Sequence, residues 1–482
     1  MKNKKKIYII FSILLTIFCT SVVRKTFEND TFSVIKIGDY IIHNGIDFVE
    51  HFNFNNLEYH NARWLFNAIV AFIYNNTDFL GVYIFSIINC IILGLIMFNV
   101  SLKHTKNHLL SFVITVISIE FIGSSIVARA QTLSYILLFL EVIFLEKMIK
   151  ENKIKYLFIL LPISVLIANI HTTVWAMTLI LILPYFAEYF LYKINKTKVL
   201  YSETKSIKLL LISFVVIALS GFLTPLGLLP YTYIYKTLSG LSTEFILEMQ
   251  KANIFFNYPL LILTIIYITF FIYIRKRIKI SDIFMVLGLF FMSIMAVRNI
   301  PIFVTICSIS LSRLFIDNID KTKLEDITNE IYKNRFIMFL IPVFIVIISS
   351  IFLFRNLYKK DYVDEFLYPT KASDYIVDNL DLDNLRLYND FDNGAYLEFR
   401  GIKVFLDSRS EVYCKEFNNT SILEDWYNAS RLKTNYKFVF NKYDFNYILL
   451  YRSEPLNNYV SFDEDYELIY NDEYFVLYEK VE

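Results

Sequence analysis

The chain is most constrained by its apolar runs, several of which reach the roughly 18–20 residues that an α-helix needs to cross a bilayer. Hydrophobic side chains make up 56% of the 482 residues and charged ones only 19%. Soluble domains carry more charge, about 25%. The sequence therefore predicts a polytopic membrane protein. The net charge of +1 gives no indication of nucleic acid as a partner.

The predicted fold class is a membrane all-α domain of about 11 transmembrane helices with a C-terminal extracytoplasmic α/β domain. The expected spans are residues 7–23, 79–101, 108–127, 131–148, 155–170, 173–192, 208–224, 258–274, 282–297, 300–316 and 336–355. Lys and Arg gather in every second short loop, which the positive-inside rule assigns to the cytoplasm. The N-terminus of this multi-pass protein of the cell membrane is then cytoplasmic, and the large first loop, 24–78, faces outward.

The last part of the chain changes character. The domain boundaries predicted from the sequence are therefore a transmembrane domain at 1–356 and an outward-facing soluble domain at 357–482. Short β-like runs alternate with helix-like stretches in this tail, which is typical of an α/β fold. The expected strands are 385–388, 403–406, 447–451, 468–470 and 475–478, and the expected helices include 371–379 and 421–431.

Isolated polar residues gather at the outward ends of the expected spans. They are Arg129, Gln131, Asn169, His171, Glu248 and Arg298. An ionisable group at membrane depth is costly and usually faces a partner or a wet cavity. The three cationic positions, Arg129, His171 and Arg298, suit a lipid phosphate or diphosphate. As alternatives, each arginine extends its side chain to the headgroups, and His171 caps a tight hairpin.

Four glutamates fall within the expected spans. Glu120 is expected to pair with an inward-facing donor. The other three, Glu141, Glu146 and Glu188, lie toward the cytoplasmic ends, and we expect them at the membrane interface.

The first loop is unusually rich in acids and histidines for a connection between two spans. Between residues 24 and 63, its acids are Glu28, Asp30, Asp39, Asp47, Glu50 and Glu58, and its histidines are His43, His51 and His60. An amphipathic stretch follows Asp30 and ends at Gly45. Asp30 is either the N-cap of that helix or a carboxylate that removes a proton or holds a metal. Residues 64–75 are apolar but too short to cross, so they predict an interfacial or re-entrant helix.

Asp30 and Gly45 fit a frame that resembles the GT-C glycosyltransferases, multi-span enzymes that use polyprenyl-phosphate sugars. In that superfamily the first outward loop opens with an Asp at the head of an amphipathic helix that ends near a Gly. Thr31 stands where a second acid often follows, and Val34 replaces a Tyr. Later in the loop Trp64-Leu65 matches a Trp-Leu segment, without its two prolines.

Further segments are similar to a set of bacterial GT-C-like membrane proteins. They are Arg129-x-Gln131, Asn169-Ile-His171, Thr224-Pro-Leu-Gly227, the tail segment 388–397, and Lys403-Val-Phe-Leu-Asp407-Ser-Arg409. Asp407 and Arg409 follow an apolar strand-like run. They are therefore either a salt bridge that fixes a loop or ligands above the site.

The resemblance implies a glycosyltransferase that moves a sugar from a polyprenyl-phosphate carrier to a glycan or protein acceptor on the outer face, among membrane lipids. Asp30 would be the general base or a metal ligand, and Glu50, Glu58 and His60 are second choices. The substrate-binding set would be Arg129, Gln131, Asn169, His171, Glu248, Arg298, Asp407 and Arg409. No cofactor is certain, and a divalent metal is compatible. The alternative is a lipid-linked-saccharide transporter or an envelope-assembly protein without catalysis.

Overall fold

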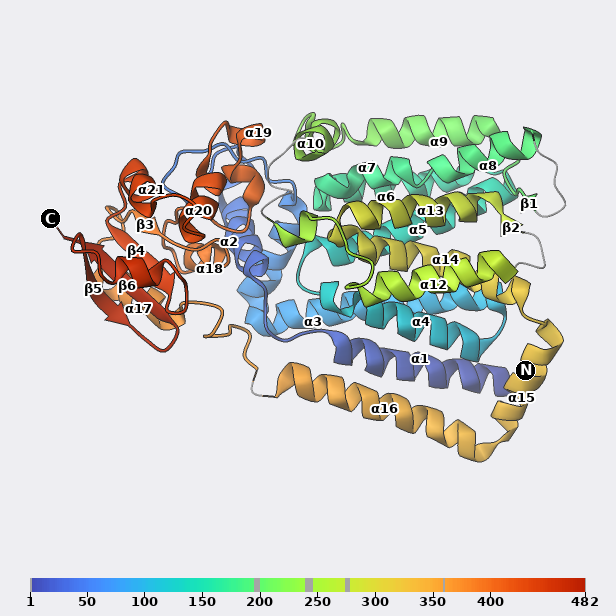
Figure 1. The fold of residues 1–482 in the computed structure, drawn as a ribbon. Coiled ribbons are helices and arrows are strands. Elements are labelled where there is room, and N and C mark those ends of the chain that lie inside the picture. Colours follow the sequence, from blue (N-terminus) through green and yellow to red (C-terminus); the bar gives the residue numbers. More distant parts are fainter. Residues whose placement is uncertain (1, 195–199, 239–245, 274–277, 359, 482) are drawn as a thin grey trace. The chain divides into compact units, whose positions relative to one another are not determined.

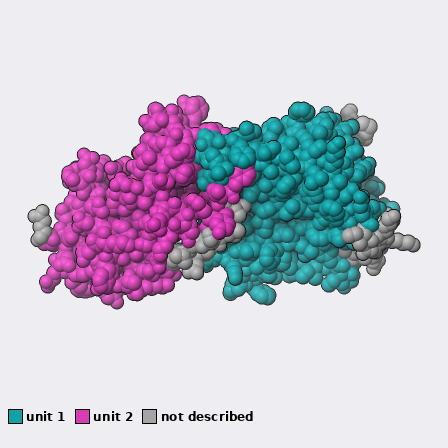
Figure 2. Space-filling model, turned by 90° about the horizontal axis from the view of Figure 1, so that it is seen from above, with its two compact units in different colours: residues 1–25, 83–230, 247–359 teal, residues 26–82, 231–246, 360–482 magenta. Residues whose placement is uncertain are grey.

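The computed structural model describes residues 2–194, 200–238, 246–273, 278–358 and 360–481. The chain divides into two compact units, coloured separately in Figure 2. Unit 1 comprises Met1–Lys25, Tyr83–Pro230 and Leu247–Lys359, and unit 2 comprises Thr26–Val82, Tyr231–Ile246 and Lys360–Glu482. The long first loop therefore belongs to the same compact unit as the tail.

Unit 1 is a bundle of helices that run side by side (Figure 1). Its helices are α1 (Lys2–Val22), α4 (His108–Ile122), α5 (Ala130–Glu151), α6 (Leu157–Ile170), α7 (Thr172–Ile180), α8 (Leu183–Ile194), α9 (Ile207–Ser220), α12 (Tyr258–Tyr273), α13 (Ile280–Met295), α14 (Ile300–Asn318), α15 (Lys321–Lys333) and α16 (Arg335–Leu357). The helices α3 (Trp64–Thr105) and α10 (Leu229–Leu238) contribute to both units. Short elements complete the bundle: η1 (Gly123–Ser125), η2 (Ile154–Tyr156), η3 (Leu247–Met249), η4 (Val297–Asn299) and the parallel strand pair β1 (Leu200–Tyr201) and β2 (Ile278–Lys279).

Each expected span coincides with a helix, or with the pair α7 and α8 for residues 173–192. Within the described residues, six helical segments are long and apolar enough to cross a membrane, and four further apolar helices are shorter. The number of crossings, 11, therefore stays a prediction. The expected helix at 64–75 is the first part of α3, which breaks at Asp78, where φ is 54° and ψ is −161°.

Two of the acids expected at the membrane interface, Glu146 and Glu188, are bonded to other segments of unit 1; Glu188 is buried and Glu146 is 14% exposed. Glu146 contacts Arg313 Nη1 at 2.9 Å, and Arg313 also pairs with Asp282. Glu188 accepts backbone hydrogen bonds from Glu203 and Thr204 at 2.7 and 2.9 Å. Buried charges are paired or hydrogen-bonded because isolated ones cost too much, so these acids connect helices and do not face solvent.

Glu141 was also expected at the membrane interface, but its surroundings differ from those of Glu146 and Glu188. Its side chain is completely buried. Among the described residues, neither carboxyl oxygen has a hydrogen-bond partner. By contrast, Glu120 accepts a hydrogen bond from the Tyr258 hydroxyl at 3.1 Å, and because Tyr258 is exposed, this donor is not the inward-facing one that was expected.

Unit 2 contains a four-stranded sheet in the order β3-β4-β6-β5, in which β3 and β4 are parallel and the other pairs antiparallel. The strands are β3 (Leu387–Tyr388), β4 (Tyr447–Tyr451), β5 (Tyr466–Asn471) and β6 (Phe475–Lys480). The other elements are α2 (Asn29–Asn44), α17 (Thr370–Asn379), α18 (Gly394–Phe399), η5 (Ser410–Tyr413), α19 (Lys415–Asn418), α20 (Ile422–Ser430), α21 (Tyr436–Tyr443) and α22 (Asn457–Val460).

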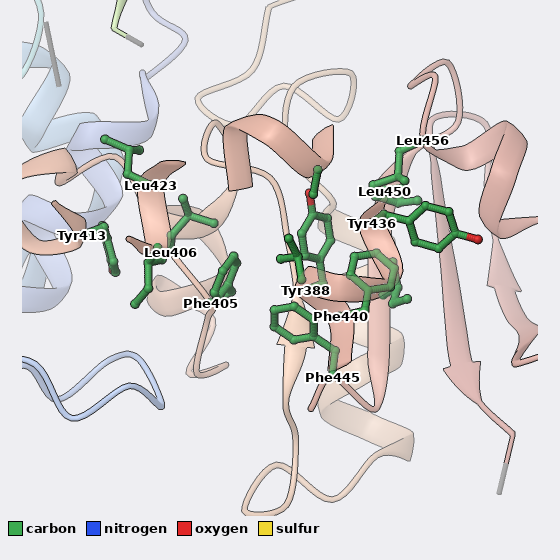
Figure 3. Packing of buried hydrophobic residues seen from close by; sticks show 14 of the residues in the cluster. Tyr388, Phe405, Leu406, Tyr413, Leu423, Tyr436, Phe440, Phe445, Leu450 and Leu456 are labelled. Atoms are coloured by element: carbon green, nitrogen blue, oxygen red, sulfur yellow. The ribbon is translucent and has the colours of Figure 1, made fainter. Parts of the chain in front are cut away.

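These elements confirm four of the five expected strands and both expected helices of the tail. The exception is 403–406, where Val404 forms only an isolated bridge with Asn53 of the first loop. Tyr388, Phe405, Phe440 and Phe445 pack together in the core beside the sheet (Figure 3). The first loop adds Ile37 and Tyr59 to this core, so loop and tail share one hydrophobic interior.

Candidate active site

Asp30 lies in the first turn of α2 and is not its N-cap, which corrects the sequence prediction. The N-cap is Glu28, which makes no side-chain capping bond. The end of the helix is as predicted, because Gly45 follows it with a φ of 85° and donates its N–H to the carbonyl of Ile41. Glycine adopts this φ without the strain that a side chain would add. Asp30 is therefore available for a role other than capping.

The Asp30 carboxylate faces a nearby guanidinium. Arg63 Nη1 lies 3.4 Å from Asp30 Oδ2, and the two side chains are only 14% (Asp30) and 12% (Arg63) exposed. Burial opposes the charge of Arg63, but Asp30 and Glu411 outweigh it, so the pKa of Arg63 is raised. Burial also raises the pKa of Glu411, against the effect of Arg63. The first turn of α2 thus carries an acid held beside a permanent cation.

Neighbouring Asn29 attaches this turn to the tail. Its side-chain nitrogen donates to the carbonyl of Phe391 at 3.0 Å, and its oxygen accepts the N–H of Tyr396 at 3.3 Å. Both partners lie in the tail segment 388–397 that the sequence singled out. Sequence reasoning missed Asn29, although its place directly before Asp30 in an asparagine-rich loop was a signal.

Three of the predicted site residues meet in a buried charge network in unit 2. Arg409 Nη1 lies 2.6 Å from Glu50 Oε2, and its Nε lies 2.9 Å from both oxygens of Asp407. The fourth member, Glu398, lies 2.7 Å from Arg409 Nη2. All four side chains are 0% exposed. The structure thus favours the salt-bridge alternative for Asp407 and Arg409.

One guanidinium faces three carboxyl groups in this network, so their protonation differs. Burial raises the pKa of Glu398 well above its ordinary value, and Asp407 and Glu50 raise it further against the effect of Arg409. Despite burial, Arg409 lowers the pKa of Asp407 to about 2. The protonated form is therefore favoured at Glu398 and the ionised form at Asp407. Glu398 follows Leu397, one residue beyond the segment that the sequence comparison used, and was missed.

The other second-choice acids and bases are more accessible. Glu58 is 78% exposed, and its carboxylate lies 4.0 Å from His60 Nε2. Burial lowers the pKa of His60, and Lys236 adds to this, against the opposite effect of Glu58. The imidazole is therefore neutral at pH 7 and can accept a proton.

In unit 1, Arg129 precedes α5 directly and pairs with another predicted residue. Its Nη1 lies 2.8 Å from Glu248 Oε1. Gln131 lies one residue into the helix, and its side-chain oxygen is buried without a hydrogen-bond partner among the described residues. The backbone N–H of Val297 donates to the carbonyl of Gln250 at 3.1 Å, so Arg298 lies close to the same segment and is exposed.

His171 and Asn169 lie at the junction of α6 and α7. The Nδ1 of His171 lies 2.8 Å from the hydroxyl of Ser134 in α5, and the histidine is 5% exposed. Asn169 donates to the carbonyls of Val165 and Leu223 at 2.8 and 2.9 Å. His171 makes no side-chain capping bond at this junction, and its hydrogen bond to Ser134 joins the hairpin to α5 instead. Arg129, Asn169, His171, Glu248 and Arg298 thus lie at or beside helix ends of unit 1, and among them Arg129 and Glu248 contact each other.

The described residues include no group of three or more His, Cys, Asp and Glu side chains arranged to hold a metal ion. Asp30, which the resemblance offers as a metal ligand, instead has Arg63 beside it. A cation next to a carboxylate disfavours a bound divalent metal electrostatically. The described residues around Asp30 therefore do not fit a bound metal ion.

Comparisons with known proteins support the fold. No protein-family model and no curated protein matches the sequence. Among solved structures, the chain is similar to the Archaeoglobus fulgidus oligosaccharyltransferase tethered by a disulfide bond to an acceptor peptide with the NVT sequon. The TM-score is 0.51 and the identity 8%, over 92% of this chain and 69% of that chain. At this identity the likeness concerns the fold alone. The chain therefore has a fold similar to that of this oligosaccharyltransferase.

Proposed function

We propose that this protein is an integral-membrane glycosyltransferase of the GT-C type. It moves a sugar from a polyprenyl-phosphate carrier to a cell-envelope acceptor on the outer face. The observation that carries the proposal is the position of Asp30 in the first turn of α2 within a GT-C-like fold. The sequence relation to the bacterial GT-C-like set is part of the same proposal.

In the proposed reaction Asp30 accepts the proton of the acceptor nucleophile, which attacks the anomeric carbon of the sugar. The bond from that carbon to the phosphate oxygen breaks, and the polyprenyl phosphate leaves with the electron pair. Arg63 orients the Asp30 carboxylate between turnovers. Arg129 and Arg298 stabilise the negative charge of the departing phosphate. Glu58 and neutral His60 are the second choices for the base.

His171, Asn169 and Gln131 have a different proposed role. Because His171 and Asn169 are nearly buried and bonded to neighbouring helices, they position the loop ends that carry Arg129. Gln131 is the residue we propose for a direct polar contact with the donor. In unit 2, Glu50, Asp407 and Arg409 are positioning residues, because their side chains are completely buried.

The experiment is transfer from a radiolabelled polyprenyl-phosphate sugar by the purified full-length protein. Asp30→Asn should lower the rate by ~100-fold or more while the protein still inserts normally, as for loss of a general base. Asp39→Asn is the matched control, because Asp39 lies on the same helix and its side chain is 45% exposed. Full activity of Asp30→Asn excludes Asp30 as the base. Absence of transfer by the wild type from a panel of such donors contradicts the proposed function.

The alternative of a lipid-linked-saccharide transporter has one observation in its favour. Glu141 is a buried acid within α5 without a hydrogen-bond partner among the described residues, and such acids often serve transport. A transporter should be disabled by Glu141→Gln and unaffected by Asp30→Asn. The enzyme should show the reverse pattern.

A further inference from the structure

Arg129, the cation proposed to bind the lipid phosphate, already contacts an anion of the protein. Its Nη1 lies 2.8 Å from Glu248 Oε1, and the two residues are 119 positions apart in the sequence. The side chain of Arg129 is 17% exposed and that of Glu248 is 55% exposed. The contact is therefore a partly screened ion pair, of a kind that contributes little to stability.

The two partners differ in how firmly they are held. Arg129 is the N-cap residue of α5, a helix of 22 residues, and the next residue, Ala130, is buried. Glu248 is the middle residue of η3, an element of three residues, none of which is buried. Moving Glu248 therefore breaks few packing contacts, whereas Arg129 stays where the helix puts it.

A carboxylate and a phosphate bind a guanidinium in the same way. The carboxylate is planar and the phosphate tetrahedral, but the oxygens of both accept charge-assisted hydrogen bonds from its N–H groups. Two anions at one edge of Arg129 repel each other, so they exclude one another. We propose that Glu248 is an internal competitor, which occupies Arg129 in the resting protein and gives way when the phosphate of the lipid donor binds. Only the identity of the ligand rests on the proposed function.

This competition has a quantitative consequence. A ligand that needs the unpaired state of Arg129 binds with an apparent affinity reduced by the fraction of protein in that state. Because a partly exposed ion pair is weak, that fraction is moderate. Removing the charge of Glu248 should therefore tighten binding of a phosphate lipid by ~2- to 10-fold.

The test is direct binding of farnesyl phosphate to the full-length protein in detergent. Glu248→Gln keeps the size of the side chain and removes its charge, so we expect the ~2- to 10-fold tighter binding. Arg129→Gln should weaken binding by ~10-fold or more, as expected for loss of a charged hydrogen-bond donor. In the Arg129→Gln background, Glu248→Gln should have no further effect, because there is no longer a contact to compete for.

Two controls separate this effect from others. Glu120→Gln removes the same net charge from a carboxyl that bonds to Tyr258, so it should leave binding unchanged. Farnesol has the same chain without the phosphate, so Glu248→Gln should not alter its binding. Unchanged or weaker binding of farnesyl phosphate to Glu248→Gln, or tightening that persists without Arg129, overturns the proposal. Because binding is measured and not transfer, this result is independent of the Asp30→Asn experiment.

Discussion

Glu50 of the first loop and Arg409 of the tail form a fully buried ion pair across 359 positions of sequence, with 2.6 Å between Oε2 and Nη1. Arg409 also lies over the ring of Tyr59, 4.8 Å from its centroid. The pair joins two segments that the sequence assigned to separate domains. It explains physically why the loop, which is long and polar, has one defined conformation against the tail.

Breaking this pair should destabilise unit 2. Glu50→Gln removes one carboxylate that bonds Arg409 while Asp407 still compensates the guanidinium, so the cost is that of a lost charge-assisted hydrogen bond, about 1.5–3 kcal/mol. The measurement is thermal unfolding of the purified protein in detergent, followed by intrinsic tyrosine and tryptophan fluorescence. Glu58→Gln in the same loop should leave the midpoint unchanged because that side chain is 78% exposed. Equal midpoints for wild type and Glu50→Gln would show that the pair is not a structural requirement.

Replacing Glu398 should change how the stability of the folded protein depends on pH. Its pKa is raised in the folded protein, first by burial, from an ordinary value of 4.5. The folded state therefore holds a proton that the unfolded chain releases above about pH 4.5, so stability falls as the pH rises through this window. Glu398→Gln mimics the neutral form, so its midpoint should fall less than that of the wild type as the pH rises above about 4.5. Parallel curves for the two proteins would mean that Glu398 is ionised.

Asn29→Ala should loosen the turn that carries Asp30. Two hydrogen bonds to the tail are lost, each worth about 0.5–1.5 kcal/mol. Hydrogen–deuterium exchange should then become faster in the first turn of α2 and at Tyr396. Asn44→Ala at the other end of the helix is the control, because its side chain bonds only locally to Tyr40. No change in exchange near Asp30 would show that other contacts hold this turn.

Glu141→Met should stabilise unit 1. The carboxyl is completely buried and has no hydrogen-bond partner among the described residues, and such a group costs about 1–3 kcal/mol. Methionine is similar in length and apolar, so the substitution removes the penalty without a large cavity. The thermal midpoint in detergent should rise. A lower midpoint would indicate a polar partner such as a bound water.

The predicted topology is tested by reporter fusions after residues 205 and 357. Alkaline phosphatase should be active only in the second fusion and a cytoplasmic fluorescent reporter only in the first, because the Lys- and Arg-rich loops are expected inside. The same side for both fusions would contradict the topology and, with it, the outward location of Asp30.

The sequence alone determined the local properties of this protein. A run of about 20 apolar residues indicates a buried or lipid-facing helix. The positions of the unit 1 helices along the sequence could therefore be predicted. Gly45 marked the end of α2 because few other residues adopt its backbone conformation. The strands β4, β5 and β6 were readable from apolar side chains that recur in short runs.

Only the tertiary structure decided which charges meet. The pairing of Arg129 with Glu248, and of Arg409 with Glu50 and Glu398, depends on segments far apart in the sequence. It also showed that Glu146 pairs with Arg313 and that Glu188 accepts hydrogen bonds from Glu203 and Thr204, contacts that stabilise an acid inside the protein. Helices and turns are determined by residues close together in the sequence. The partner of a charged side chain is determined by tertiary packing, so no local sequence pattern predicts it.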